Sequence, residues 1–455
     1  MKRTLIILYI LASALQVSAE ALSIDSCRAL ALQYNKDRQS AALTTKQAEY
    51  TRKSTYAMFF PDLSLQGAGM YSTGNGGLSI DLGSMLAPTL ANLATMASAY
   101  GISLPNVSLP SYDLDYKVGW VYGAGVMLKQ PIYMGGKIRA GYSMAKTAVE
   151  MARENERLTD AQVIQQTDEA YAQVVKAEEL KRVAESYKSL LEELDRNVES
   201  AVRHGLRMDN DRMKVQVKLN EVELQLRRAD NGVRLAKMNL SHCIGSPLGG
   251  DIEVLSEYPE VDDAMALQTT DVSQRPEVAL LDYQTQLAEQ KVKIARSEML
   301  PQVALLAKYG YTHGVEFNDR TLLEGWSFAG GVTVSVPIYH FGEHTNKVKA
   351  AKLKQQQMQL ERDNKAEMML LELTQAANKL DEARLEKELT EKSLAQAEKS
   401  MQLSRQQYDA GFETLGDCLE SQAQWQQAYQ QSVDASFQLY LASVAYMKAA
   451  GTLVP

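Results

Sequence analysis

The sequence contains an internal repeat, which restricts the chain to folds that have two equivalent halves. Residues 119–126 read GWVYGAGV and residues 325–332 read GWSFAGGV, a separation of 206 positions (325 − 119 = 206). The Pro-Ile-Tyr triplets that start at Pro131 and Pro337 have the same separation. Agreement without a gap over this stretch predicts that one structural unit occurs twice in the chain.

Upstream of these segments the separation changes, which indicates an insertion in the first half. FPDL at residues 60–63 matches LPQV at residues 300–303, a separation of 240 positions (300 − 60 = 240). The 34 additional residues (240 − 206 = 34) lie between Ser72 and Tyr116 and include several glycines and prolines. This composition predicts a long surface loop, with a short helix near residues 86–100.

Proline-free stretches predict two unusually long helices, over residues 141–205 and 342–411. The chain has 11 prolines, but none lies between Pro131 and Pro247. Helices of this length would reach ~100 Å, because each residue adds about 1.5 Å. Apolar residues recur at heptad spacing, which predicts coiled-coil packing. These positions are Leu180, Val183, Tyr187, Leu190 and Leu194 in the first half, and Ala366, Leu370, Leu373, Ala377 and Leu380 in the second.

Each long helix is expected to end in a tight turn and to be followed by a returning helix. Gly205 and Gly411 come at the two expected ends, and glycine readily adopts the positive φ that follows a helix C-terminus. The returning helices are predicted over residues 209–243 and 415–450. Each half therefore has the order helix, strand, loop, strand, long helix, turn, helix.

The segments before the long helices predict strand pairs with two different faces. In the last strand of the second half, large apolar residues alternate with small or polar ones, and the first half repeats this pattern. Strands of about 10 to 12 residues suit a tilted membrane-spanning segment, although a half-buried sheet in a water-exposed domain has a similar pattern. The aromatic residues that would form a membrane girdle are Tyr71, Trp120, Tyr122, Tyr309, Tyr311, Trp326 and Phe328.

The number of strands has a consequence for assembly. Four strands cannot close a membrane barrel, because the smallest barrels have about eight strands. Open sheet edges are not tolerated in hydrocarbon, where each unpaired N–H or C=O group costs several kcal/mol. If the strands span a membrane, several chains must share one barrel, and three chains would supply twelve strands.

The N-terminus predicts export. Lys2 and Arg3 precede an apolar run over residues 5–15, and the small residues before the predicted cleavage after Ala19 complete a secretory signal. No later segment offers the ~20 apolar residues that a spanning helix needs, so no inner-membrane anchor is expected. The expected division of the chain is a signal peptide at 1–19, a first repeat at 20–245, a linker at 246–274 and a second repeat at 275–455.

Charge and cysteine content exclude some classes of protein. The formal net charge is −8 and would become more negative after loss of Lys2 and Arg3, so nucleic-acid binding is not expected. Cys27, Cys243 and Cys418 are too few and too scattered for a disulfide framework.

Several motifs resemble the TolC-like outer-membrane efflux factor family. They are LSIDSCRALAL at residues 22–32, the two Pro-Ile-Tyr segments followed by glycine, YDAG at residues 408–411 and LGDCLESQ at residues 415–422. Together with the repeat, they extend the resemblance over essentially the whole chain after the signal. The resemblance implies a mainly α-helical fold with a small membrane β-barrel. Three chains, with four strands each, would form a 12-stranded barrel that continues into a long periplasmic α-helical coiled-coil barrel.

The same resemblance implies a function and a set of partners. It implies the exit duct of a tripartite efflux or type I secretion system in the outer membrane of a Gram-negative-type cell. The expected partners are two further copies of the chain, outer-membrane lipid, a periplasmic adaptor (membrane fusion) protein and an inner-membrane pump. The adaptor is expected to dock at the turns that contain Gly205, Leu206, Gly411 and Phe412.

The resemblance also implies a closed periplasmic end that must open. The expected constriction involves Asp211, Tyr408, Asp417 and Glu420. Asp417 and Glu420 are three apart and share a helix face, so threefold symmetry would stack two carboxylate rings of the kind that favour cations. Without the resemblance, a solvated acidic helix face explains the same residues.

One departure concerns the lock of this constriction. Many relatives have a basic residue two positions after the second-turn glycine, where this chain has Glu413. Arg207 occupies the matching position in the first half. If Arg207 pairs with acidic residues of a neighbouring hairpin, the lock is rearranged in this protein.

No catalytic, cofactor or metal site is predicted. His340 and His344 are four apart but lack a third ligand, and the 19 methionines are scattered. Nucleophile elbows, phosphate loops and HExxH motifs do not occur in the sequence, so an exported enzyme is not favoured. The main alternative to a channel is a structural periplasmic coiled-coil or adaptor protein without a pore, but such a protein would have one helical hairpin rather than two.

Overall fold

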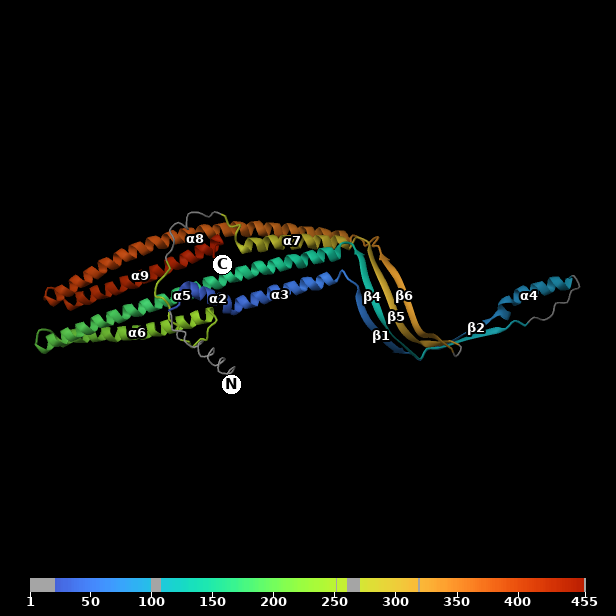
Figure 1. Ribbon diagram of the computed structural model, residues 1–455, viewed down its shortest axis with the longest axis horizontal. Coiled ribbons are helices and arrows are strands. Elements are labelled where there is room, and N and C mark those ends of the chain that lie inside the picture. The colour runs from blue at the N-terminus through green and yellow to red at the C-terminus, as the bar shows by residue number, and fades with distance from the viewer. Residues whose placement is uncertain (1–20, 100–107, 251, 260–270, 318–319, 454–455) are drawn as a thin grey trace, which may run out of the picture. The chain divides into compact units, whose positions relative to one another are not determined.

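The computed structural model describes residues 21–99, 108–250, 252–259, 271–317 and 320–453. The predicted signal peptide lies outside these residues. Figure 1 shows the elements in chain order. In the first half they are α2 (Ile24–Tyr34), α3 (Lys36–Ala57), β1 (Asp62–Tyr71), β2 (Asn75–Asp81), α4 (Leu82–Ala99), β3 (Ser111–Lys117), β4 (Trp120–Met134), α5 (Lys137–Arg203) and α6 (Asp209–Cys243). In the second half they are α7 (Pro276–Ser297), β5 (Gln302–Phe317), β6 (Arg320–Ser335), α8 (Glu343–Asp409) and α9 (Leu415–Ala450).

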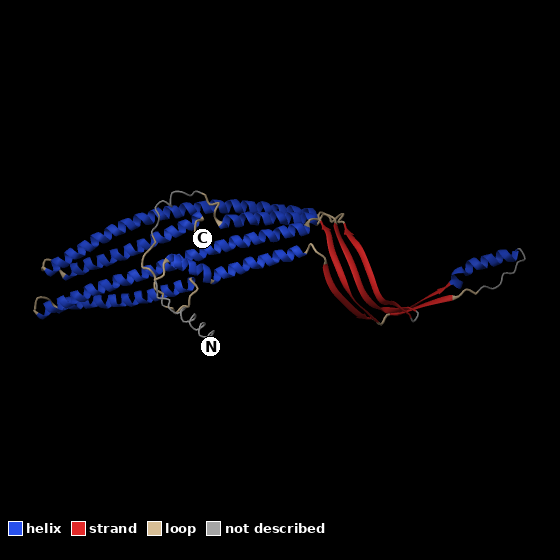
Figure 2. Ribbon diagram, in the orientation of Figure 1, coloured by secondary structure: helices blue, strands red, loops and turns tan. Residues whose placement is uncertain are grey.

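The internal repeat is confirmed by the element boundaries. The first and last residues of α3 and α7 are separated by 240 positions (276 − 36 and 297 − 57). Those of α5 and α8 are separated by 206 positions (343 − 137 and 409 − 203). The mainly helical fold with a small antiparallel sheet is confirmed as well (Figure 2). The boundaries of the repeats and of the linker remain a prediction.

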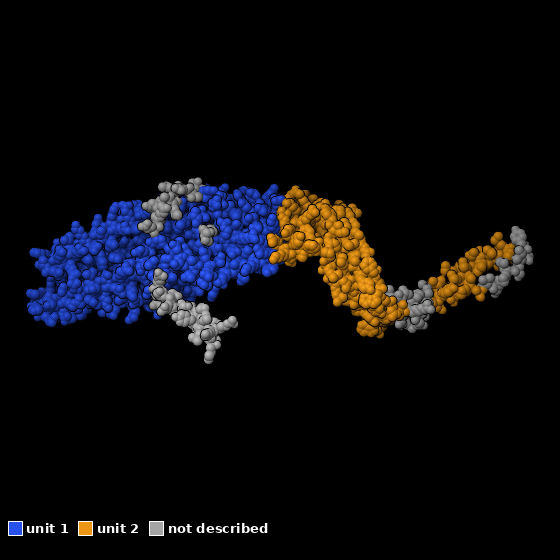
Figure 3. All heavy atoms as spheres, in the orientation of Figure 1, with its two compact units in different colours: residues 1–51, 145–289, 353–455 blue, residues 52–144, 290–352 orange. Residues whose placement is uncertain are grey.

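The chain forms two compact units, each of which combines segments from both halves (Figure 3). The helical unit comprises residues 1–51, 145–289 and 353–455, and the strand unit comprises residues 52–144 and 290–352. Within the described residues, none of the helices combines the length and the apolar character required to cross a membrane.

In the helical unit, apolar seams connect helices from both halves. One core cluster joins α5 to α6 and to α2, and another joins α5 to α9. A third joins α8 to α9, so these contacts place α6 and α8 on opposite sides of the α5–α9 pair. The long helices thus bury their heptad positions against neighbours, as coiled coils do.

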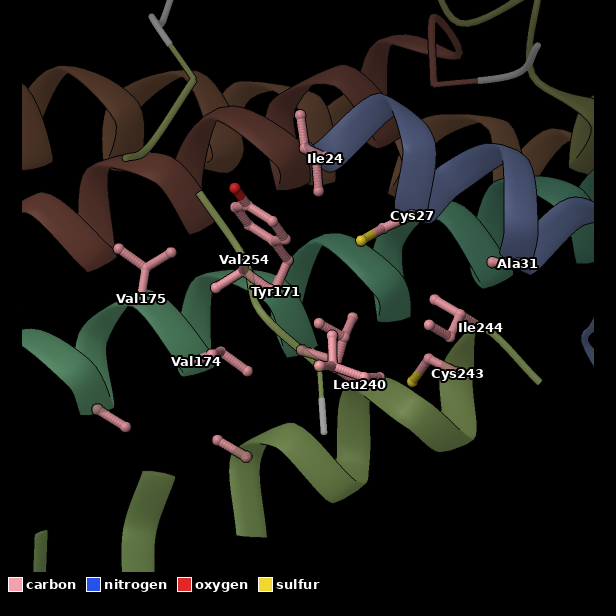
Figure 4. Packing of buried hydrophobic residues seen from close by; sticks show 14 of the residues in the cluster. Ile24, Cys27, Ala31, Tyr171, Val174, Val175, Leu240, Cys243, Ile244 and Val254 are labelled. Carbon is pink, nitrogen blue, oxygen red and sulfur yellow. The ribbon is translucent and has the colours of Figure 1, made fainter. Parts of the chain in front are cut away.

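The short helix α2 is fixed to the long helix α5 by apolar and charged contacts. Figure 4 shows the Cys27 side chain of α2 pointing toward Tyr171 of α5, and Ile244, which follows α6, belongs to the same cluster. The Arg28 guanidinium donates to both carboxylate oxygens of Asp168, over 2.7 and 2.6 Å. Because Asp168 is fully buried, this two-bond contact compensates the loss of its hydration.

In the strand unit, the principal sheet has the order β1–β4–β5–β6, and all its pairs are antiparallel. The register places Leu65 opposite Val126, Val126 opposite Tyr309, and Tyr309 opposite Phe328. These large residues share one face and are exposed. The predicted two-faced sheet is present, but β4 has 15 residues and β5 and β6 have 16, so they exceed the predicted length.

The opposite face of the sheet carries glycines where two strands approach closely. Gly125 of β4 lies opposite Gly310 of β5. A Cβ atom built on Gly125 would lie 2.8 Å from the Gly310 Cα, and one built on Gly310 would lie 2.7 Å from the Gly125 Cα. Glycine is therefore required at both positions for β4 and β5 to pair.

The insertion in the first half forms more regular structure than the predicted loop. Strands β2 and β3 pair from Asn75 opposite Lys117 to Asp81 opposite Ser111, and α4 lies between them. The predicted helix is present, but the strands were missed because the glycines of β2 and the prolines elsewhere in the insertion indicate a loop when only local sequence is considered.

We predict that Gly125→Val prevents formation of the sheet. A valine side chain would collide with the β5 backbone, which cannot move without loss of the β4–β5 hydrogen bonds. Gly119→Val is the matched control, because a Cβ there would meet no atom within 4 Å. The amount of folded protein recovered from outer membranes should collapse for Gly125→Val and stay normal for Gly119→Val. Equal recovery of the two variants would contradict this account.

Candidate functional site

The two helical turns of the helical unit have the same backbone geometry. Gly205 and Gly411 have φ values of 70° and 81°. The amide of the next residue donates to the carbonyl five positions earlier: Leu206 to Ala201 over 2.9 Å and Phe412 to Gln407 over 2.8 Å. This pattern is a Schellman motif, which satisfies the last carbonyls of α5 and α8. Both predicted turns are therefore present at the ends of the long helices.

The residues after the two glycines are apolar and project into solvent. Leu206 is 76% exposed and Phe412 is 88% exposed. Met208, two positions after Leu206, is also exposed. Exposed apolar side chains at the ends of hairpins are typical of surfaces that contact another protein.

Beside the turns, the structure brings together three of the five predicted constriction residues. The Arg207 guanidinium carbon lies 4.9 Å from the centre of the Tyr408 ring, a cation–π contact between the first turn and the end of α8. Burial raises the pKa of the Tyr408 hydroxyl, and the nearby Asp211 carboxylate acts in the same direction. Arg207 forms no ion pair within the described part of one copy, so its charge is available to a neighbour.

The other two predicted residues lie on the exposed side of α9. The amide of Asp417 donates to Thr414 Oγ1 over 3.3 Å, and the Thr414 hydroxyl donates to the Asp417 carboxylate over 2.6 Å. This reciprocal cap starts α9 and holds the Asp417 carboxylate at the positive end of the helix. Glu420 accepts from Gln424 and is exposed. The two carboxylates thus share an exposed face of α9.

A buried polar group lies between the turn and α9. The Glu413 side chain is half-buried, and its Oε2 atom is buried without a hydrogen-bond partner. Its charge contributes, after burial, to raising the pKa of the Cys418 thiol to about 11. An unpaired buried carboxylate oxygen is costly, so Glu413 gains stability from any rearrangement that brings a donor to it.

Ion pairs between helices near the turns were not predicted from the sequence. Arg405 of α8 pairs with Glu193 of α5, which joins the two hairpins. Arg212 of α6 lies 3.2 Å from Glu199 and 3.7 Å from Asp195, both on α5. Each helix carries many charges at solvated positions, so the sequence provides no signal that selects these partners.

Five of the seven predicted aromatic residues form two groups in the strand unit. Tyr71 and Trp120 have ring centres 5.3 Å apart, and Tyr309 stacks on Trp326 at 5.3 Å. Tyr311 contacts the edge of Trp326, with ring centres 5.9 Å apart. Six of the seven predicted aromatic side chains are exposed, namely Tyr71, Trp120, Tyr122, Tyr309, Trp326 and Phe328.

The described residues do not form a metal site. No cluster of three or more His, Cys, Asp or Glu side chains suits a metal ion in this part of the chain. The His340 and His344 rings lie 4.4 Å apart, and His344 Nδ1 is 3.7 Å from the Glu298 carboxylate.

Comparison with known proteins decides the family. The sequence model of the family described as "Outer membrane efflux protein" matches residues 28–246 and 272–452. The chain belongs to this family. Its members are outer-membrane channels and not enzymes, so the predicted location in the outer membrane and the predicted role as an efflux exit duct are confirmed.

Individual relatives support the assignment. The outer membrane efflux protein BepC of Brucella suis is 23% identical over 336 residues, which cover 72% of each chain. The structure of CusC superposes with a TM-score of 0.74 at 15% identity and covers 94% of this chain and 92% of its own. VceC of Vibrio cholerae has a TM-score of 0.72 at 17% identity, with 94% and 96% covered. At these identities the structures establish the fold.

We predict that loss of the Glu193–Arg405 pair loosens the ends of the two hairpins. Arg405 lowers the pKa of the Glu193 carboxyl below its ordinary value of 4.5. A lowered pKa means that this link is present above about pH 4.5 and is lost as the pH falls through the folded-state pKa. Glu193→Gln should reproduce that loss at neutral pH.

The measurement is the distance distribution between spin labels at Leu206 and Phe412. The distribution should broaden for Glu193→Gln at pH 7 while its mean stays the same, because the apolar core of the hairpins persists. Glu192→Gln is the matched control, since Glu192 pairs with Lys188 on its own helix. An equally broad distribution for the control would refute the role of the Arg405 pair.

Proposed function

We propose that three copies of the chain form one outer-membrane efflux duct. The observation that carries this proposal is the sheet β1–β4–β5–β6. Within the described residues, β1 pairs only with β4 and β6 pairs only with β5, so both outer edges are open. Its apolar face suits lipid, where an open edge is not tolerated. Three sheets joined edge to edge give a closed barrel of twelve strands, within the known range.

The helical unit supports assembly of the same three copies. Large apolar side chains remain exposed along the two helices that lie at its sides, α6 and α8. A single copy would leave this surface in water, whereas contact of α8 with α6 of the next copy covers it. Six helical hairpins, two from each copy, would enclose the tunnel. The exposed residues are Val217, Leu224 and Leu235 on α6, and Leu353, Leu360, Leu385 and Leu389 on α8.

At the turns, the duct docks a periplasmic adaptor that links it to an inner-membrane pump. Leu206 and Phe412 provide the apolar contacts at these two turns, and Gly205 and Gly411 shape the backbone that presents them. The cargo is whatever the pump delivers, either small toxic compounds or a secreted protein.

The closed state is held at the same end by charged and aromatic groups. Arg207 stacks on Tyr408 and has no ion pair among the described residues of its own copy, and it reaches an acidic group such as Glu413 of a neighbouring hairpin. Asp211 lies beside this contact. Asp417 and Glu420 form two carboxylate rings under threefold symmetry and make the constriction selective for cations.

We predict that a photo-crosslinker at Leu206 or Phe412 captures a periplasmic adaptor in cells. Mass spectrometry identifies the captured protein, and a crosslinker at Leu43, an exposed residue of α3 far along the chain from both turns, is the matched control. Capture of an adaptor from the turns and not from Leu43 would support docking. Capture of only envelope-spacing proteins would favour a structural role without a pore.

We predict that Arg207→Ala opens the constriction and that Asp417→Asn with Glu420→Gln reduces its preference for cations. The first variant removes a lock, whereas the second removes six charges from a trimer and leaves the lock in place. Single-channel conductance in planar bilayers should rise several-fold for the first. Reversal potentials under a salt gradient should shift toward zero for the second. Unchanged conductance and selectivity would remove these residues from the gate.

A further inference from the structure

The helix α4 leaves a row of large apolar side chains in water. It lies between β2 and β3, in the insertion that only the first half of the chain contains. Apolar surface of this kind marks a contact with a partner. Its exposed Leu and Met side chains have exposed fractions of 38–71% and belong to Met85, Leu86, Leu90, Leu93 and Met96.

The large side chains of α4 form one stripe along the helix. Leu86, Leu90 and Leu93 are four and three positions apart, a spacing that keeps them on the same face of an α-helix. The opposite face carries small residues, among them Ala91 and Thr95. The Thr95 hydroxyl donates to the Ala91 carbonyl over 2.7 Å, so it is satisfied within the helix. One face of α4 is therefore left to be covered, and it is the apolar one.

The sequence around α4 is free of charge. Between Asp81 and Asp113, 31 successive residues include no Asp, Glu, Lys or Arg (113 − 81 − 1 = 31), although 23% of the chain is charged. Such a surface does not suit a partner that is recognised by charge. It also differs from helices that lie on membranes, which carry Lys or Arg on one face and Trp or Phe on the other. None of these four residue types occurs in α4.

Identical copies around a threefold axis account for both the stripe and the missing charge. A side chain near such an axis faces the same side chain of the other copies. A charge there would be repelled by its equivalents, whereas an apolar side chain is buried by them. Asn92, seven positions after Met85 and four before Met96, lies beside the stripe and is the one amide side chain of α4. An asparagine in a helical core fixes register, because it bonds to its own copies.

The attachment of the insertion lets three such helices meet. Strand β3 pairs with the end of β5, where Tyr116 lies opposite Phe317, so the β2–β3 pair continues the sheet beyond β4. Twelve strands that are about 4.8 Å apart and tilted by about 40° enclose a barrel with a radius of roughly 12 Å. The 18 residues of α4 reach ~27 Å. The helix is therefore long enough to extend from the wall of the barrel to its axis.

We propose that the apolar stripe of α4 packs against the same stripe of two other copies and forms a three-helix bundle over the outer mouth of the duct. This inference rests on the proposed trimer. In the bundle, Leu86, Leu90 and Leu93 face the axis, and the small residues face water. The outer mouth then has a closure of its own, separate from the constriction at the helical turns.

Disulfide formation between copies tests the bundle. Leu93→Cys places a thiol on the stripe, where it meets the same thiol of a neighbouring copy. Ala91→Cys is the matched control, because Ala91 is also exposed but lies on the opposite face. On mild oxidation of the full chain in outer membranes, Leu93→Cys should give disulfide-linked dimers, whereas Ala91→Cys should stay monomeric on denaturing gels. The natural cysteines do not interfere, because all three are buried.

Lysine substitutions test the contact by charge. Leu90→Lys brings three like charges together at the axis, so trimers should separate into monomers at a lower temperature on semi-denaturing gels. Ala91→Lys adds the same charge to the outer face and should leave that temperature unchanged. Both positions are exposed in one copy, so the fold of the single chain persists in either variant, which circular dichroism verifies.

A fluorophore on Met96→Cys distinguishes neighbouring copies from lipid as the cover of the stripe. In vesicles that contain brominated phospholipid, its emission should keep the intensity that it has in vesicles without bromine. Quenching by the brominated lipid would overturn the bundle and show that α4 lies in the membrane.

The remaining outcomes separate the bundle from the trimer. Equal yields of dimer from Leu93→Cys and Ala91→Cys, or an unchanged separation temperature for Leu90→Lys, would overturn the bundle. In both cases a trimeric mass of the unaltered protein in detergent, measured by light scattering, would leave the proposed duct intact. A monomeric mass would instead overturn the proposed trimer and the bundle with it.

Discussion

The requirement that every backbone N–H and C=O group in hydrocarbon has a partner governs the strand unit. Four antiparallel strands with an apolar face satisfy it inside the sheet but not at the outer edges of β1 and β6. A chain of this design is incomplete as a single copy. The two-faced alternation also excludes pairing that is one residue out of register, because such a shift would turn the apolar side chains to the other face. The same incompleteness appears in the helical unit, where α6 and α8 expose rows of apolar side chains.

The internal repeat provides the geometry with which such a chain is completed. The pairing of β4 with β5 joins the two halves of one copy, so an equivalent pairing of β6 with β1 can join two copies. The two halves of the chain are equivalent in backbone conformation, as at the left-handed turns of Gly135 and Phe341. The equivalence fails where one half of the chain has room for a side chain and the other half does not. Gly135 has no room for a Cβ atom, whereas Phe341 carries a full aromatic ring.

The sequence predicted the elements with regular local patterns and missed those that depend on distant partners. The returning helices end within one residue of the predicted bounds, because a glycine turn and heptad spacing are local signals. Strands β2 and β3 were missed because their pairing joins residues across an intervening helix. At the turns, Arg207 and Tyr408 were predicted as functional residues, but neither their stacking nor the Arg405–Glu193 pair follows from spacing. Both depend on how side chains of different helices meet.

The distribution of burial near the turns restricts how the duct can open. One apolar cluster contains Leu191 of α5, Val215 of α6, Tyr408 of α8 and Trp425 of α9, so the two hairpins of a copy share a core. Separation of these hairpins would expose aromatic rings at a cost of roughly 25 cal/mol for each Å² of apolar surface. The predicted constriction residues Asp417 and Glu420 are instead exposed and Arg207 is half-buried in one copy, so water replaces their lost contacts at little cost. Movement of whole hairpin pairs against their neighbours is therefore the less costly way to widen the constriction.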